Sequence, residues 1–345
     1  MYVGSFQYRF KSVLFGKNGA QIYSLFYPYQ HSWYIFFERK VYPFHLARVL
    51  RSQLNLMSDL HTSCPVCQST EIKKVNQFII KNIWRCNQCS LAFFANRATQ
   101  EEIRDYYAQY PRDHYESPVT ILRYKQILSE FSRLTAGKKI LDYGCNSGFF
   151  LAVAQENGWE VVGAEISEEA REICKNRGLY VTDLDAFYHE YKPKSFDVIL
   201  SSEVIEHMEF PAQFFKRSFE LLKPGGILYV TTPNFDALER KILGDKYDIV
   251  NFPEHLCFFN KKSLRKCGES HGFKTHKITT TGFSLTRIRT STKASREKYV
   301  SQTSTDEQIR VKTEKSLVLR FIKNTVNALL NVSNTGNALK GWFRA

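Results

Sequence analysis

The stretch Lys139-Ile-Leu-Asp-Tyr-Gly-Cys-Asn-Ser-Gly148 decides the fold of this chain. It starts with an apolar run typical of a short buried strand, and Asn146-Ser-Gly-Phe-Phe-Leu opens a helix. Its two glycines let the backbone turn tightly and pass close to a ligand. The start of a helix offers unpaired N–H groups to a polar ligand. The pattern predicts a strand, a ligand-binding loop and a helix; an ordinary strand–turn–helix connection is the alternative.

A second apolar strand, Val161-Val-Gly-Ala, ends in Glu165, twenty-one residues beyond Gly144. An acidic side chain at this strand end is placed to accept two hydrogen bonds from a ribose diol. The spacing G-x-G-x-x-G, which is typical of nicotinamide-binding loops, is absent here. The absence of this glycine spacing argues against a nicotinamide cofactor.

Asp142-x-Gly144-x-x-x-Gly148, followed by a strand-end acid, resembles the nucleoside-binding half of class I S-adenosylmethionine (SAM)-dependent methyltransferases. The usual pattern has glycine at the position of Asn146, and asparagine is among the few residues that tolerate a left-handed backbone. Two further motifs support the resemblance over about residues 135–282. The segment 196–207 is similar to the fourth strand and loop of methyltransferases of the ubiquinone pathway, and Leu221-Leu-Lys-Pro-Gly-Gly is similar to the turn into their fifth strand.

Strands and helices alternate regularly in this part of the chain, which predicts an α/β fold with a doubly wound, Rossmann-like parallel sheet. The apolar runs predict strands at 139–143, 160–164, 179–182, 196–201, 227–232 and 272–281. Helical spacing and caps predict helices at 119–134, 147–157, between Ser167 and Gly178, and at 211–222. A capping box, Thr99-x-x-Glu102, predicts the start of a further helix.

Four of the eight cysteines form two C-x-x-C pairs, Cys64/Cys67 and Cys86/Cys89, separated by 18 residues. Such pairs bring four thiolates together at tetrahedral geometry and predict a zinc ribbon, with strands at 75–80, 83–85 and 91–94. Four cysteine ligands leave no open position, so we expect a structural Zn²⁺; a redox or free-thiol cluster is the alternative. The remaining cysteines are scattered, and this usage is typical of a cytoplasmic protein.

The net charge of +14 is unevenly distributed along the chain. Lys and Arg number 7 against 2 acidic residues in 1–60, 23 against 27 in 61–260, and 18 against 5 in 261–345. A slightly acidic core argues against a nucleic-acid substrate. Basic flanks suit an acidic membrane surface, a phosphorylated substrate or solubility. No apolar run is long enough for a transmembrane helix, and the N-terminus lacks the pattern of a signal peptide.

The flanks are harder to interpret than the core. Residues 22–37 fit short strands, and 44–58 and 316–332 have helical spacing. The latter helix either packs on the core or, with Lys315, Arg320 and Lys323, makes a peripheral contact with a membrane. We expect a last strand over 338–343. The domain organisation that follows is 1–60 aromatic-rich extension, 61–96 zinc ribbon, 97–282 methyltransferase core and 283–345 basic helical region.

The order of zinc ribbon, Tyr106-Tyr107 helix, methyltransferase core and then Pro253-Glu-His-Leu-Cys-Phe-Phe259 resembles the zinc-ribbon methyltransferases of bacterial sugar and polysaccharide pathways, including nucleotide-sugar C-methyltransferases. This resemblance covers about 61–282. It implies a sugar or nucleotide-sugar acceptor and a catalytic role for Glu254 and His255, which fall on the pair that lies in the substrate pocket of that family.

The resemblance also implies a set of cofactor contacts. Residues that would wrap the methionine end of SAM are Asp142, Gly144, Cys145 and Gly148. Glu165 would take the ribose hydroxyls, and Ser202 would lie near the sulfonium. Residues that would border the adenine are Ile166, Asp183 and Leu184.

Methyl transfer to a hydroxyl, or to a carbon beside a carbonyl, also requires a base that removes a proton. Histidine is the natural candidate at neutral pH, which favours His255 or, second, His207; purely structural histidines are the alternative. Tyr106, Tyr107 and Tyr110 would either stack on the acceptor or pack in the core.

Three classes of function remain open on the sequence. They are a methyltransferase acting on a sugar or another small molecule such as a quinone, an RNA methyltransferase that reads its substrate with the ribbon, and a binding protein that keeps the fold. The nearly complete SAM motifs argue against the last. The acceptor, the choice between O- and C-methylation, and the oligomeric state are not fixed by the sequence.

Overall fold

The fold is described from a computed structural model. It describes residues 10–15, 21–27, 32–37, 40–43, 60–78, 81–99, 101–103, 106, 117–284, 287–288 and 305–345. The chain divides into two compact units, residues 1–60 and 61–345. The expected helix over 44–58, Tyr107 and Tyr110, and most of 285–304 lie outside the described residues.

The first unit contains a four-stranded antiparallel sheet in which each strand pairs with the next along the chain. Its strands are β1 (Phe10–Phe15), β2 (Gln21–Tyr27), β3 (Ser32–Phe37) and β4 (Lys40–Pro43). The expectation of short strands over 22–37 is confirmed by β2 and β3, while β1 and β4 were not expected from the sequence.

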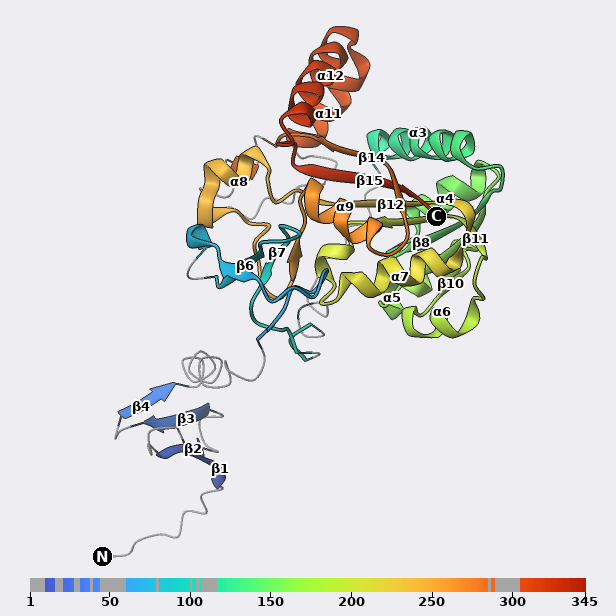
Figure 1. Cartoon of the computed structure of the whole chain (residues 1–345). Helices are drawn as coiled ribbons and strands as arrows, with labels where there is room; N and C mark the ends of the chain where they lie inside the picture. The colour runs from blue at the N-terminus through green and yellow to red at the C-terminus, as the bar shows by residue number, and fades with distance from the viewer. Residues whose placement is uncertain are drawn as a thin grey trace, which may run out of the picture. The chain divides into compact units, whose positions relative to one another are not determined.

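The second unit is built around a seven-stranded sheet with the order β10-β9-β8-β11-β12-β15-β14 (Figure 1). Its strands are β8 (Lys139–Tyr143), β9 (Glu160–Ala164), β10 (Val181–Thr182), β11 (Phe196–Ser202), β12 (Leu222–Pro233), β14 (Lys274–Thr281) and β15 (Ala338–Arg344). Strands β10, β9, β8, β11 and β12 are parallel, and β15 runs antiparallel to both neighbours. The predicted doubly wound α/β sheet is confirmed, as is the expected last strand.

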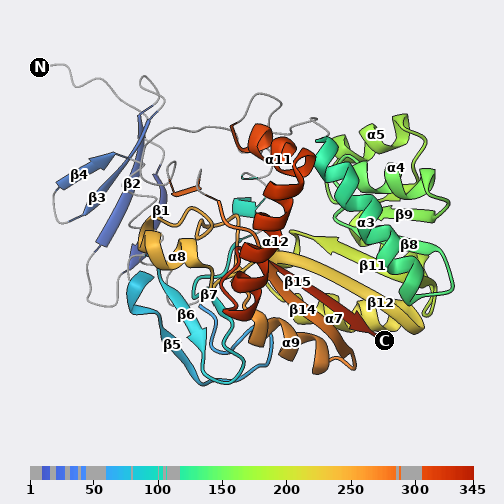
Figure 2. The ribbon, with the colours of Figure 1, turned by 90° about the horizontal axis from the view of Figure 1, so that it is seen from above.

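Helices cover both faces of this sheet (Figures 1 and 2). They are α3 (Pro118–Leu134), α4 (Phe149–Glu156), α5 (Glu168–Asn176), α6 (Leu184–Glu190), α7 (Pro211–Leu221) and α9 (Lys261–Glu269). Helix α8 (Leu238–Leu243) instead packs against the ribbon, where Leu243 shares an apolar cluster with Phe78. Neighbouring strand residues point to opposite faces: Ile140 packs with α3 and α4, whereas Leu141 packs with α7 and α9. The site described next lies where the parallel strands end.

The ribbon forms a separate four-stranded sheet in the order β13-β7-β6-β5. Its strands are β5 (Ile72–Lys74), β6 (Ile83–Cys86), β7 (Ala92–Phe94) and β13 (Cys257–Phe258). The expected strand over 75–80 is wrong in this region, because Asn76–Phe78 form a 3₁₀ turn that buries Phe78 beside Phe235. Strand β13 comes from the segment that carries Glu254 and His255, so the ribbon is joined to that segment by backbone hydrogen bonds.

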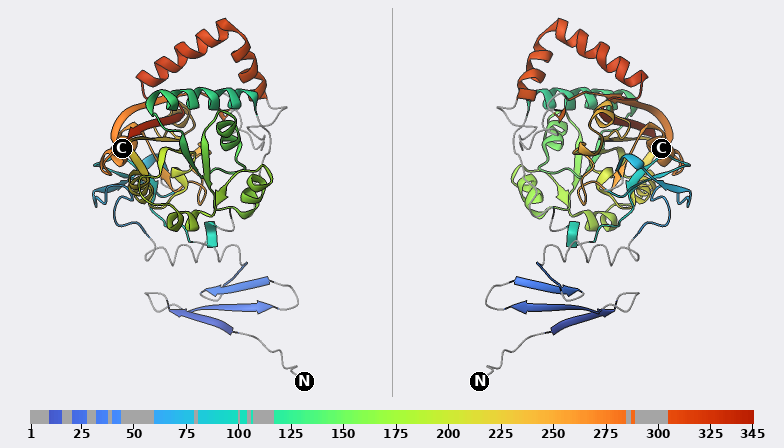
Figure 3. Two further views of the ribbon diagram at one scale, coloured as in Figure 1. Left: turned by 90° about the vertical axis from the view of Figure 1, so that its right-hand side faces the viewer. Right: turned by 90° about the vertical axis from the view of Figure 1, so that its left-hand side faces the viewer.

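Two helices, α11 (Thr305–Lys315) and α12 (Leu317–Val332), connect β14 to β15. They project beyond α3 (Figure 3), and α12 contacts the end of β14 through Asn327 and Asn331. The interpretation of 316–332 as a helix that packs its apolar side on the core is wrong, because the structure leaves most of those side chains exposed. None of the described helices is long and apolar enough to cross a membrane.

Candidate functional site

The loop between β8 and α4 has three residues with left-handed backbone. Gly144 has φ +80°, Asn146 φ +47° and Gly148 φ +77°. A Cβ atom added at Gly144 would lie 2.6 Å from Val204 Cγ2, in the loop after β11. Glycine is therefore required at 144 by both its backbone angle and its space. The loop passes close to the end of β11, and we call residues 142–148 the cofactor loop.

Glu165 ties the cofactor loop to the next strand. Its Oε2 accepts a hydrogen bond from Asn146 N at 2.9 Å, and its Oε1 accepts one from Ser167 N at 2.9 Å. A carboxylate has about four acceptor sites, so ribose hydroxyls can still donate to it. Asp142 is buried at the start of the loop, where burial and, second, the charge of Glu165 raise its pKa well above the usual range.

The side chain of Ile166 is 65% exposed directly beside Glu165, and a flat apolar ligand could lie against it. Arg171 Nη1 donates to Asp183 Oδ2 at 2.9 Å. This bond fixes the position of Asp183, directly before Leu184 begins α6. The hydroxyl oxygens of Ser202 and Thr231 lie 2.9 Å apart at the ends of β11 and β12. These positions lie along one edge of the sheet, as the sequence predicted. The side chain of Cys145 is buried with Cys174 and Leu179, which leaves only its backbone for a ligand.

His207 and His255, the histidine pair, lie with ring centroids 4.7 Å apart. His207 Nδ1 donates to the carbonyl of Glu254 at 2.6 Å, and His255 Nδ1 donates to the carbonyl of Ile249 at 2.7 Å. Because a carbonyl only accepts, each neutral ring carries its proton on Nδ1. The Nε2 of His255 can then act as a base. Burial lowers the pKa of both rings, that of His207 to about 4.

A third member of this cluster, Glu206, was not singled out from the sequence. Its Oε2 accepts from Thr232 at 2.9 Å, while its buried Oε1 has no hydrogen-bond partner among the described residues and lies 3.9 Å from His207 Nε2. Burial raises its pKa well above the usual range. One oxygen of Glu206 and one ring nitrogen of each histidine lie within 4.8 Å of one another, so this donor set could also hold a metal ion.

Glu254 contacts the histidine pair through its backbone. The Glu254 carboxylate accepts from Asn251 Nδ2 at 2.9 Å, so its backbone carbonyl, rather than its carboxylate, contacts the histidine pair.

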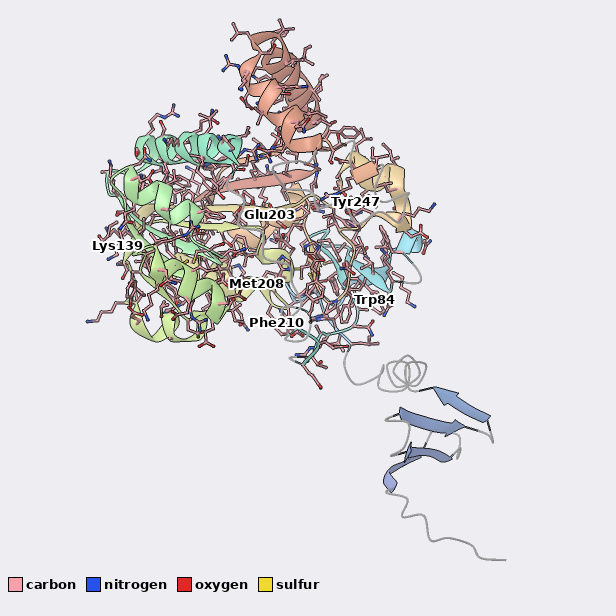
Figure 4. All side chains as sticks on the ribbon, turned by 180° about the vertical axis from the view of Figure 1, so that it is seen from behind. Trp84, Lys139, Glu203, Met208, Phe210 and Tyr247 are labelled. Carbon is pink, nitrogen blue, oxygen red and sulfur yellow. The ribbon has the colours of Figure 1, made fainter. Side chains whose placement is uncertain are left out.

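Glu203, at the end of β11, has left-handed backbone with φ +55°, which is uncommon for glutamate. Figure 4 places Glu203 and Met208 between Lys139 on the sheet and Trp84 on the ribbon.

The four ribbon cysteines come together as their spacing predicts. Cys64 Sγ lies 3.5 Å from Cys89 Sγ, and Cys67 Sγ lies 3.5 Å from Cys86 Sγ. All four sulfur atoms are within 4.8 Å of one another, and Cys64, Cys86 and Cys89 are buried. This donor set fits a tetrahedral Zn²⁺ with no open coordination position.

The environment of His207 predicts a pH effect on stability. Its folded pKa of about 4 lies below its unfolded value of 6.5, so the unfolded chain binds the proton first. The stability that neutral His207 allows is complete above pH 6.5 and is lost as pH falls toward 4. The expected loss is roughly 2 kcal/mol at about pH 5. Urea unfolding of wild type and His207→Gln at about pH 7 and about pH 5 measures it.

The comparison with His207→Gln is needed because Asp142 and Glu206 have raised pKa values and therefore gain stability as pH falls. We expect the free energy of unfolding of the variant to fall less than that of wild type over this pH range. Equal slopes for the two proteins would contradict the buried, neutral state of His207.

Comparison with known proteins identifies the central part of the chain. Residues 115–278 match the family model described as a methyltransferase domain. Over 133 residues the chain is 35% identical to a ubiquinone biosynthesis O-methyltransferase of Mesorhizobium japonicum, covering 36% of this chain and 53% of that protein. Over 157 residues it is 28% identical to the protein of that name from Coxiella burnetii, covering 41% and 66%. The chain thus spans between about half and two thirds of the length of these relatives.

Solved structures of similar architecture have low sequence identity to this chain. A SAM-dependent methyltransferase from Archaeoglobus fulgidus is 20% identical with a TM-score of 0.43, over 64% of this chain and 94% of that one. A putative sarcosine dimethylglycine methyltransferase from Galdieria sulphuraria is 17% identical with a TM-score of 0.45, over 71% and 98%.

Proposed function

Because this chain contains a class I SAM-dependent methyltransferase domain, we propose that it transfers the methyl group of SAM to a small-molecule acceptor, with a buried histidine as the base. One observation carries the proposal. Strand β8 pairs with β11 in parallel, so the cofactor loop after β8 and His207 after β11 lie at the same edge of the sheet. His255, from the segment after β12, lies beside His207 with ring centroids 4.7 Å apart. In an open α/β sheet this edge is where ligands bind.

The cofactor loop has the features that a bound SAM needs. A nucleoside with a methionine tail requires acceptors for its ribose hydroxyls and ammonium, and N–H groups for its carboxylate. Glu165 would accept from the ribose, and the backbone of residues 144–148 and the start of α4 would border the methionine end. Ile166 is exposed beside Glu165, where an adenine would lie. When bound, SAM would supply an electrophilic methyl group on a sulfonium; alignment of the acceptor then supplies much of the acceleration.

The histidine pair would remove the acceptor's proton. Nε2 of His255 is available because its Nδ1 is occupied by the carbonyl of Ile249. His207 is held at the same site, where its Nδ1 donates to the carbonyl of Glu254 and burial lowers its pKa to about 4, so it accepts a proton poorly. We therefore assign proton removal to His255 and positioning of the acceptor or of His255 to His207. Glu254 acts in this scheme through its carbonyl, which fixes the tautomer of His207.

Two classes of acceptor are supported by features of the chain and its relatives. A sugar or nucleotide sugar is our first candidate. The zinc ribbon lies against the segment that carries His255, because β7 pairs with β13. This combination of parts resembles that of the zinc-ribbon methyltransferases of sugar pathways. A phenolic quinone precursor is the second candidate, favoured by the names of the O-methyltransferase relatives. Both acceptors lose a proton from the reacting group, so both need the same base.

Transfer of labelled methyl from SAM to a panel of nucleotide sugars, keto-sugar nucleotides, catechols and bulk RNA tests the proposal. We expect label on a small molecule, and a fall of roughly a hundred- to ten-thousand-fold in kcat for His255→Ala. SAM affinity of that variant, measured by calorimetry, should be unchanged, since the ring lies on the acceptor side.

Two variants guard against a simple folding defect. His255→Gln can still donate to Ile249 O but is no base, so it should be as inactive as His255→Ala and as stable as wild type. His276→Ala, in β14 away from the site, should keep full activity. Label on RNA, or transfer that is indifferent to His255, would overturn the assignment of acceptor and base.

A further inference from the structure

Helix α12 turns its apolar side away from the protein. Its most exposed large apolar side chains are Leu317 (74%), Val318 (68%), Phe321 (72%), Ile322 (50%), Leu329 (66%) and Val332 (81%). At 100° per residue these six positions fall within an arc of about 140° on one side of the helix. We call this set the apolar arc. No charged residue lies within it.

The opposite side of α12 is polar, and this is the side that contacts the sheet. Asn327 Oδ1 accepts from Gly282 N at 2.8 Å, and Asn331 Oδ1 accepts from Thr280 N at 2.9 Å. Leu330, at the edge of this side, is the one residue of α12 that is buried. The side chains of Asn327 and Asn331 thus satisfy backbone N–H groups at the end of β14 and fix the rotation of the helix. The apolar arc cannot turn inward without breaking these bonds.

A surface helix of a globular protein normally has the reverse arrangement, with apolar residues inward and polar residues outward. An exposed and contiguous apolar patch of this kind marks a contact with a membrane or another macromolecule. Helix α12 stands at the outer end of the α11–α12 hairpin, beyond α3, so the body of the unit does not screen it (Figure 3).

The charges around the apolar arc indicate which contact is made. Residues 317–332 contain Arg320 and Lys323 and no acidic residue. Lys323 forms an ion pair with Glu314, whereas Lys312 and Lys315 lie at the turn into α12. A cationic helix with a wide apolar arc is the composition that binds an anionic lipid surface.

We propose that α12 is a membrane-docking helix that inserts its apolar arc into the surface of an anionic lipid bilayer. Two copies of this chain meeting through α12 would bring like charges together, which disfavours a dimer as the occupant. A 16-residue helix is roughly 24 Å long, shorter than the bilayer core of about 30 Å. Its amphipathic character suits a position parallel to the membrane plane, with Arg320, next to the edge of the arc, reaching the lipid phosphates.

Flotation of the purified full chain with vesicles tests this proposal. We expect binding to phosphatidylcholine vesicles that contain about one third phosphatidylglycerol, weaker binding to pure phosphatidylcholine, and a loss of binding as salt is raised. The double variant Val318→Glu/Phe321→Glu should bind anionic vesicles at least about tenfold less. Both side chains are exposed, so the fold should be unaffected, which circular dichroism and SAM affinity check.

A control introduces a single glutamate at an exposed apolar residue elsewhere. Ile242 of α8 is 56% exposed, and Ile242→Glu should bind vesicles as wild type does. Absence of binding to either vesicle, or equal binding by the double variant, would overturn the proposal. A dimer seen by light scattering that the double variant abolishes, without vesicle binding by wild type, would assign the apolar arc to self-association instead.

Discussion

Gly144→Val should abolish SAM binding. The position has φ +80°, where a β-branched residue is strongly disfavoured, and an added Cβ would lie 2.6 Å from Val204 Cγ2. Either the cofactor loop or the loop after β11 must then move. Both loops form the edge at which we place the cofactor, so the calorimetric affinity for SAM should fall by at least about a hundredfold.

The matched control separates this effect from backbone strain alone. Gly178 also has a left-handed backbone, with φ +72°, but a Cβ there would meet nothing within 4 Å. We expect Gly178→Ala to cost about 1 kcal/mol of stability and to leave SAM affinity unchanged. Gly144→Ala adds a clash with Val204 to the same backbone strain, so it should lose SAM affinity and be less stable than Gly178→Ala. Unaltered SAM affinity in both Gly144 variants would refute the cofactor site.

Cys86→Ser should release the ribbon's metal and lower methyl transfer as well. We expect one Zn²⁺ in wild type by elemental analysis and none in the variant, because the four sulfur atoms form one closed set. Structural zinc stabilises such modules by about 10 kcal/mol or more, so β5 to β7 should lose their order. Strand β13 would then lose its partner β7, which frees the segment that carries His255.

Cys267→Ser supplies the control, since Cys267 is buried in α9 and is not part of the cluster. It should keep its zinc. SAM affinity, which depends on the cofactor loop after β8 and not on the segment of β13, should change little in Cys86→Ser while activity falls severely. Freshly prepared wild type without metal, or a Cys86→Ser protein with full activity, would contradict the structural role of the ribbon.

Most of the parallel sheet could be predicted because its signals are local. Ile140 and Leu141 follow one another in an apolar run, and Gly144 and Gly148 mark the turn that ends the strand. Ser167 caps α5 through a hydrogen bond from Ala170 N to its Oγ at 3.2 Å, as its place in the sequence suggested. The cofactor loop and Glu165 belong to the same local pattern, so their proximity followed from it.

The features that the sequence did not predict depend on contacts between residues far apart in the chain. Glu206 meets the segment of His255 through a backbone bond from Leu256 N to Glu206 O at 2.7 Å, across 50 residues of sequence. Nothing local marks Glu206 as buried, because a glutamate in a loop is usually exposed. The periodicity of α12 correctly predicted a helix but not which side faces the protein, since that is decided by Asn327 and Asn331 and their partners on β14.

The position of β15 between β12 and β14 bears on how the chain acquires its fold during synthesis. Trp342 fills the core on one face of the sheet and Phe343 the core on the other. Neither core can close, and the facing edges of β12 and β14 stay unpaired, until residues 338–344 have left the ribosome. Strands β12 and β14 must wait for these seven residues to complete their pairing, so a nascent chain stalled within the α11–α12 hairpin would present both open edges to chaperones or to other copies of itself.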